Sequence, residues 1–99
     1  MEGIDDVEAA LAAVRAVERP IDALKALPAV RDSLTQLEVA LARHALADGE
    51  TWATIGAALG TSRQAAWERL RPGIAAAIEA DRRRLTEERT RASKKRSSR

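Results

Sequence analysis

The chain has 99 residues, of which 45% are hydrophobic, 2% aromatic and 32% charged, and its formal net charge is +2. This length suits one small domain with a single modest core, and the absence of cysteine excludes disulfides and thiolate metal sites. No apolar run approaches the ~20 residues of a membrane span, and the N-terminus lacks the pattern of a signal peptide. We therefore expect a cytoplasmic protein that makes no membrane contact.

Charge is strongly segregated along the chain. Residues 1–50 carry 5 basic and 10 acidic side chains, residues 51–81 carry 3 of each, and residues 82–99 carry 9 basic and 2 acidic. A basic end of this kind is typical of proteins that bind a polyanion such as nucleic acid. The alternative is a solvated tail that aids solubility, and the charge pattern alone leaves both open.

Apolar spacing predicts two amphipathic helices in residues 1–49, separated by a short segment from Ile21 to Leu27. Pro20 is expected to end the first helix or begin the next, and Pro28 to precede the second long helix. That helix is expected to stop at Asp48-Gly49, where glycine suits a C-cap. Steps of three and four residues place two apolar stripes on these helices. We predict that the stripes form a homodimer interface: Ile4, Val7, Leu11 and Val14 in the first, and Val30, Leu34, Leu37 and Leu41 in the second.

His44 continues the second stripe and is expected at the boundary of the core. It has no cysteine and no clustered carboxylate beside it, so the sequence predicts no metal site and no cofactor. Nor does it offer a nucleophile with an identifiable base or a phosphate-binding glycine loop. We therefore predict that the protein is not an enzyme.

Residues 50–71 read as two short helices joined by a tight turn. Glu50 or Thr51 can begin the first helix, in which Ile55 and Leu59 are four residues apart and are expected to face inward. Gly60 is expected to end it.

The second of these helices is expected to begin at Thr61 or Ser62, whose side-chain oxygen can cap free backbone N–H groups. Ala66 and Leu70 are then expected to face inward. Alanines and Gly56 keep the facing surfaces small, so the two helices can approach closely.

The stretch "IGAALGTSRQA" resembles the helix-turn-helix of small bacterial transcriptional regulators, particularly the class similar to sigma-factor region 4. The longer run from Leu34 to Leu70 also resembles small regulators in which a helix precedes a Trp-Ala-x-Ile-Gly motif. Thr61 and Ala66 depart from the usual pattern, in which both positions are more apolar. The resemblance implies binding to double-stranded DNA in the nucleoid through the helix 62–71.

In this geometry the N-terminal residues of the second helix meet base edges in the major groove. Arginine can make two hydrogen bonds to guanine and glutamine two to adenine. The threonines near the start of the first helix can contact phosphate. The predicted DNA contacts within the motif are Thr51, Thr54, Ser62, Arg63, Gln64, Trp67 and Arg71. The alternative for Arg63 and Gln64 is an ordinary exposed turn.

The two tryptophans receive different interpretations. Trp52 lies three residues before Ile55 and is expected to pack against the preceding helix. Trp67 is either half-buried packing or a DNA contact. Glu68 is expected to pair with Arg69 or Arg71, or to accept a hydrogen bond from a cytosine amine.

Pro72 and Gly73 are expected to break the chain before a last helix that ends near residue 91. Its apolar stripe, Ile74, Ile78 and Leu85, is a rival site for the dimer interface. Residues 92–99 are expected to form a disordered basic tail. Near DNA this tail can lie along phosphates through Lys94, Lys95 and Arg96.

The sequence as a whole predicts an all-α protein of four to five helices, with a central helix-turn-helix and a basic C-terminal tail. The favoured function is a dimeric DNA-binding regulator or small chromosome-associated protein. The alternative is a helical adaptor that binds RNA polymerase or another regulator and keeps the helix-turn-helix as scaffold.

Overall fold

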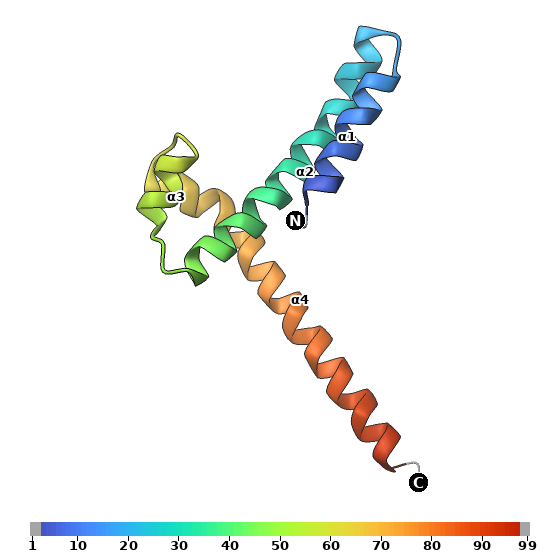
Figure 1. Cartoon of the computed structure of the whole chain (residues 1–99), viewed down its shortest axis with the longest axis vertical. Helices are drawn as coiled ribbons and strands as arrows, with labels where there is room; N and C mark the ends of the chain where they lie inside the picture. The colour runs from blue at the N-terminus through green and yellow to red at the C-terminus, as the bar shows by residue number, and fades with distance from the viewer. Residues whose placement is uncertain (1–2, 98–99) are drawn as a thin grey trace.

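The computed structural model describes residues 3–97, with side chains as far as Lys95, and all regular structure in this range is helical. Four helices follow one another along the chain (Figure 1). They are α1 (Ile4–Ala16), α2 (Pro20–Ala47), α3 (Trp52–Ala58) and α4 (Arg63–Ser97). The prediction of an all-α protein is thus confirmed, and the four helices lie within the predicted range of four to five. Within the described range, no helix combines the length and the apolar character needed to cross a bilayer.

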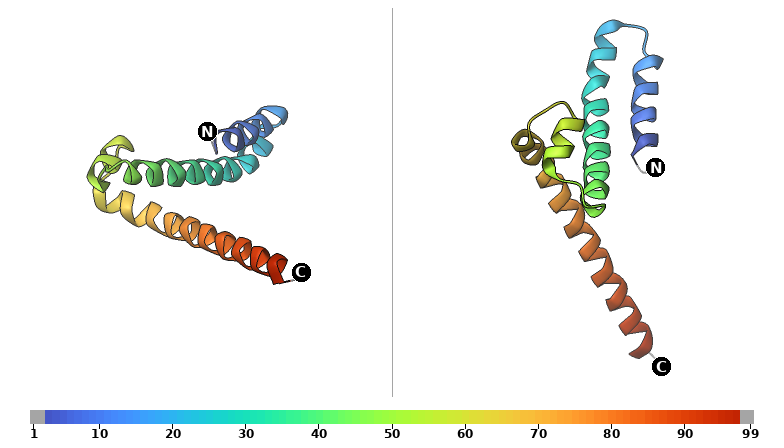
Figure 2. Two further views of the ribbon diagram at one scale, coloured as in Figure 1. Left: turned by 60° about the horizontal axis from the view of Figure 1, so that its bottom comes forward. Right: turned by 60° about the vertical axis from the view of Figure 1, so that its left-hand side comes forward.

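Helices α1 and α2 form an antiparallel hairpin (Figures 1 and 2). Asp5 and Asp6 occupy the first turn of α1, where the positive end of the helix dipole favours acidic side chains. Pro20 is the first residue of α2, a position that needs no backbone N–H. Gly49, with φ of 91°, follows the last turn of α2 in the left-handed conformation that glycine adopts at helix ends.

Two prolines that were expected to separate helices lie inside them. Pro28 is within α2, so the predicted short segment 21–27 is the beginning of one long helix. Pro28 is exposed, which lets water bond the Leu24 carbonyl that has lost its N–H partner.

Pro72 likewise lies inside α4, and the predicted break at Pro72-Gly73 was wrong. The first turns of α4 run in a different direction from its remainder, so the helix bends in this region rather than ending (Figure 2). A Cβ built on Gly73 would lie 2.7 Å from Val39 Cγ2. Glycine is therefore needed here because it allows α4 to cross close to α2.

The helix also continues where disorder was predicted. Residues 92–97 belong to α4, while the last two residues of the predicted tail lie outside the described range. Hydroxyls bond back to the helix backbone in this half, from Thr86 to the Arg82 carbonyl at 3.0 Å and from Thr90 to the Thr86 carbonyl at 2.9 Å. Arginine, lysine, glutamate and alanine are good helix formers, which explains why the second half of α4 is helical although it has no apolar stripe.

The core lies where α2, α3 and α4 meet. Its buried hydrophobic side chains, among the described residues, are Ala42, Ile55, Ala66, Leu70 and Ile74. Val39, Ala45, Leu46 and Trp52 pack around them. The inward positions predicted for Ile55, Ala66 and Leu70 are confirmed.

Two inward predictions were wrong. Leu59 is 39% exposed because α3 ends one turn after Ile55 and nothing covers its last residues. His44 is exposed in the last turn of α2, where a basic side chain suits the negative end of the helix dipole.

Ion pairs fasten α4 to α2 on both sides of the crossing at Gly73. Arg69 donates to Glu38, and Arg43 donates to Asp81 with 2.5 Å between Nη2 and Oδ2. The hydrogen bond from Arg43, together with the positive charges of Arg43 and Arg84, holds the pKa of Asp81 below its ordinary value of 3.8.

This pair predicts a pH-dependent contribution to stability. A carboxylate whose pKa is lower in the folded state stabilises the fold above its unfolded pKa, and the contribution disappears as pH falls through the folded value. We expect Asp81→Asn to unfold at a lower temperature than the wild-type chain at pH 7, and the difference to be smaller at a pH below 3.8. Because both side chains are partly exposed, the effect should be small and weaker in high salt. Thermal melts followed by circular dichroism test this, and an unchanged difference at both pH values would contradict it.

Candidate nucleic-acid interface

Helix α3, the turn 59–62 and the first turns of α4 form a compact unit, called here the α3–α4 unit. Thr51 caps α3 by accepting a hydrogen bond from the Thr54 backbone N–H at 3.2 Å. Gly60, with φ of 73°, leads out of α3, and Ser62 caps α4 by accepting from the Ala65 N–H at 3.1 Å. The predicted cap at Ser62 and the predicted closing glycine are confirmed, and the first helix begins after Thr51, one of the two residues predicted to start it.

Gly56 fixes how closely the turn folds onto α3. A Cβ at this position would lie 2.9 Å from both the carbonyl carbon and the carbonyl oxygen of Ser62. The Gly56 carbonyl in turn accepts a hydrogen bond from the Thr61 N–H at 2.8 Å. The start of α4 is therefore held against the backbone of α3, which orients the first residues of α4 rigidly.

The inner side of the first turns of α4 is buried and the outer side is open. Ala66 is 1% exposed and Leu70 is completely buried. On the outer side, successive steps of four residues align three exposed side chains, with Gln64 and Glu68 in the adjacent row. The aligned row consists of Arg63, Trp67 and Arg71.

The side chains of this outer side interact with one another. The Gln64 amide donates to the Glu68 carboxylate at 2.9 Å. The guanidinium of Arg71 stacks over Trp67, 4.7 Å from the ring centroid, in a cation–π contact. Arg63 forms no hydrogen bond or ion pair with any other described side chain and is fully available to a ligand.

Glu68 therefore does not pair with either predicted arginine. Gln64 binds it, Arg69 is held by Glu38, and Arg71 lies on the indole ring. The partners differ because Arg69 points toward α2, where Glu38 is within reach.

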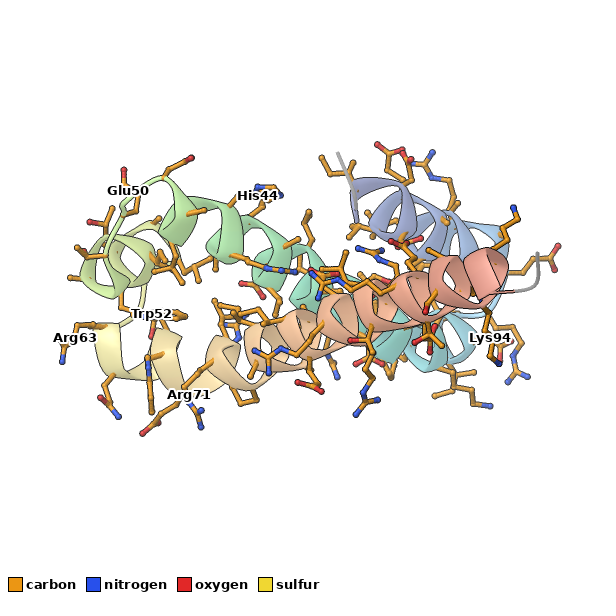
Figure 3. All side chains as sticks on the ribbon, turned by 90° about the horizontal axis from the view of Figure 1, so that it is seen from below. His44, Glu50, Trp52, Arg63, Arg71 and Lys94 are labelled. Atoms are coloured by element: carbon orange, nitrogen blue, oxygen red, sulfur yellow. The ribbon has the colours of Figure 1, made fainter. Side chains whose placement is uncertain are left out.

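A hollow of about 420 Å³ opens beside the exposed row, lined by Trp52, Arg63, Gln64 and Trp67. Trp52 is half-buried and packs against the core, as predicted, and its ring also forms one wall of this hollow. Trp67 is 38% exposed, so it is partly covered by protein and partly open to solvent. Figure 3 shows Trp52, Arg63 and Arg71 gathered at one end of the molecule.

The structure brings together part of the predicted DNA site. Arg63, Gln64, Trp67 and Arg71 share the outer side of α4, and Ser62 precedes them as the N-cap. Thr51 and Thr54 are exposed at the start of α3, but their hydroxyls lie 3.1 Å apart and bond to each other.

The predicted basic contacts lie elsewhere. Lys94 is at the far end of α4 (Figure 3), and the helix path between it and Arg63 is roughly 46 Å long at 1.5 Å of rise per residue. Lys95 is next to it, and the side chain of Arg96 lies outside the described side chains. The basic end is therefore not part of the same local site.

Sequence reasoning missed two features of this region. One is the ion pair between Arg69 and Glu38, which holds the beginning of α4 against α2. The other is the hollow between the two tryptophans. Neither has a sequence signal, because both join residues from different helices whose crossing is set by the core.

Comparison with known proteins identifies no family model, curated protein or solved structure that matches this chain.

Proposed function

We propose that the α3–α4 unit is a helix-turn-helix and that the protein binds double-stranded DNA with the first turns of α4 in the major groove. The observation that carries the proposal is the exposed row of Arg63, Trp67 and Arg71, with Gln64 beside it, on a helix whose inner side is locked to α3. A major groove about 12 Å wide admits one α-helix. A rigid support is what a reading helix needs, because bidentate contacts tolerate little movement.

Arg63 and Gln64 are the residues that we propose to read bases. Arg63 stands at the first position of α4 without a competing partner among the described residues, so it can reach the acceptors of a guanine. Gln64 is oriented by Glu68, and its amide must exchange that bond for the two bonds to an adenine. We expect Ser62, Thr51 and Thr54 to contact flanking phosphates.

In the proposed complex, Trp67 and Arg71 lie further along the exposed row and farther from the base edges than Arg63. The stacked guanidinium keeps free N–H groups, so it can bind phosphate while the indole ring holds it in place. The basic second half of α4, including Lys94, Lys95 and Arg96, adds attraction that does not depend on DNA sequence. Together these contacts support a transcriptional regulator or a small chromosome-associated protein in the bacterial cytoplasm.

The test is a series of binding measurements by fluorescence anisotropy, with random and genomic duplexes at several salt concentrations. We expect the wild-type chain to prefer some sequences, and Arg63→Ala and Gln64→Ala each to lose about 1–3 kcal/mol of discrimination at one base pair. Far-UV circular dichroism should show an unchanged fold, because both side chains are exposed. The matched control is Lys25→Ala, which removes one positive charge at the far end of the hairpin.

Each outcome has a definite meaning. If both variants keep wild-type specificity, the reading residues are placed wrongly. If Lys25→Ala weakens binding as much as Arg63→Ala, the contribution of Arg63 is general electrostatics. If the wild-type chain binds no duplex, DNA binding is refuted and the adaptor alternative, with RNA polymerase or another regulator as partner, is favoured.

A further inference from the structure

The hollow between α3 and α4 is formed by the first turns of both helices. Trp52 lines it on the α3 side, and Arg63, Gln64 and Trp67 line it on the α4 side (Figure 3). Its volume of about 420 Å³ falls within the range of roughly 300–1,000 Å³ that is usual for small-molecule sites. Trp67 and Arg63 are both exposed, so a ligand can enter the hollow directly from solvent.

The walls of the hollow contain every large aromatic side chain of the protein. The chain has two tryptophans and no phenylalanine or tyrosine, and both tryptophans line this one space. They come from different helices, so the hollow exists only because the turn 59–62 brings the two helix starts together. Planar ligands stack on indole rings, and one nucleic-acid base stacked on an aromatic side chain strengthens binding roughly 5- to 150-fold.

Trp67 is held in place from the side that faces away from the hollow. Arg71, one turn further along α4, lies over the indole with 4.7 Å between its guanidinium carbon and the ring centroid. The hollow lies on the other flank of the ring, because its α4 lining consists of Arg63 and Gln64, which precede Trp67 by about one turn. The stacked arginine therefore orients the ring without filling the space that a ligand would occupy.

The charges around the hollow favour an anion. Arg63 lines it and forms no hydrogen bond or ion pair with any other described side chain, and the positive end of the α4 dipole lies at the same position. Among the described side chains no carboxylate lines the hollow, and Glu68, the next acidic residue along α4, already accepts a hydrogen bond from Gln64. A cationic ligand, which two tryptophans alone would suit, is therefore disfavoured.

Gln64 adds a polar group beside the aromatic walls. Its amide nitrogen donates to the Glu68 carboxylate at 2.9 Å, which orients the amide and leaves its carbonyl oxygen available as an acceptor. The exocyclic amine of a base such as adenine can donate to this oxygen. An aromatic anion without an N–H group would leave the oxygen without a partner, so the hollow suits a nucleotide better than a simple aromatic acid.

We propose that this hollow binds an unpaired nucleotide, with the base against the two indoles and the phosphate on Arg63. The guanidinium donates two hydrogen bonds to the phosphate, and the base edge donates to Gln64. A free nucleoside monophosphate and a nucleotide of a single strand present the same base and phosphate. A paired base inside a duplex does not enter, because its faces are covered by the neighbouring bases. The proposal therefore does not rest on the proposed binding of duplex DNA.

The experiment is a titration of the full chain with AMP, followed by tryptophan fluorescence. The intrinsic emission comes entirely from the walls of the hollow, because no other tryptophan and no tyrosine is present. Excitation at the red edge of tryptophan absorption avoids absorption by the nucleotide. We expect saturable quenching with a dissociation constant below about 1 mM, the affinity that one stacked base and one phosphate contact supply. Emission without a saturable change up to ~5 mM AMP would overturn the proposal.

Two variants separate the phosphate contact from the stacking contact. Arg63→Ala should weaken AMP binding about fivefold or more and leave adenosine, which lacks the phosphate, unchanged. Trp67→Ala should weaken AMP and adenosine by the same factor, about fivefold or more. The matched control is Lys25→Ala, which removes an exposed positive charge from α2 and should not change the affinity for AMP. Equal losses in Arg63→Ala and Lys25→Ala would overturn the phosphate contact.

A conservative variant covers the case in which Trp67→Ala loses helical circular dichroism. Trp67→Phe keeps an aromatic ring and leaves Trp52 as the single fluorophore. We expect AMP to quench Trp52 in this variant with an affinity close to that of the wild-type chain. Emission from Trp52 that does not respond would overturn the placement of the base between the two helices.

Oligonucleotides identify the source of the nucleotide. A single-stranded oligonucleotide of deoxyadenosine that binds more tightly than AMP would assign the hollow to a nucleic-acid strand, and equal or weaker binding would assign it to the free nucleotide. The proposed binding of duplex DNA is measured separately by anisotropy. A chain that binds duplex but not AMP overturns the present proposal alone, whereas a chain that binds AMP but no duplex supports it and refutes the proposed function.

Discussion

Leu70→Ala should lower the free energy of unfolding by about 2–5 kcal/mol, the usual cost of removing a buried leucine side chain. Leu70 is completely buried among Ala42, Ile55, Ala66 and Ile74, which come from three helices. Few other side chains share this core, and the neighbouring alanines are too small to fill the space. We expect much of the stability of the α3–α4 unit to disappear.

Urea unfolding followed by circular dichroism measures this effect at a fixed protein concentration. A fixed concentration keeps any contribution from self-association equal in the two chains that are compared. Leu85→Ala is the control: its side chain is 53% exposed, so its free energy of unfolding should change by less than about 0.5 kcal/mol. Equal effects of the two substitutions would show that the described core does not hold the helices together.

The second large effect is expected for Gly56→Ala. In most helices a change from glycine to alanine stabilises by about 0.5–1 kcal/mol, because alanine has the better helix propensity. Here the new Cβ would lie 2.9 Å from the backbone of Ser62, so the turn must move away from α3. We expect a loss of about 1–3 kcal/mol, the range found for overpacked sites.

The sign of the change separates packing from propensity. Ala57→Gly, at the exposed neighbouring position of α3, should lose about 1 kcal/mol by propensity alone. If propensity governed both positions, Gly56→Ala would gain stability and the close approach would be refuted. We further expect Gly56→Ala to weaken sequence discrimination on DNA, since the shifted turn carries Ser62 and Arg63 with it.

Local features of the α3–α4 unit were predictable because each depends on a few neighbouring residues. Thr51 and Ser62 cap helices through their own hydroxyls, and Gly60 adopts a positive φ in the turn. Steps of four residues placed Ala66 and Leu70 on the inner side. These features depend on hydrogen bonds and periodicity within one turn of helix, so they can be predicted directly from the sequence.

The errors arose where local rules compete with packing. Pro72 and Gly73 together indicate a helix end, but α4 continues because Gly73 allows contact with Val39 and ion pairs hold the helix on both sides of it. Leu59 satisfies the inward spacing, but no element covers it.

The sequence by itself determined the all-helical fold, the position of the tight turn at residues 59–62 and the charge difference between the two ends of the chain. Each of these follows from composition, spacing or capping within short segments. Only the tertiary structure decided which residues of each apolar stripe are partly buried inside the hairpin. It also decided which arginines form ion pairs with α2 and which remain exposed at the start of α4. The physical reason is that an apolar stripe indicates which side of a helix is removed from water. Which element covers that side depends on how the helices cross.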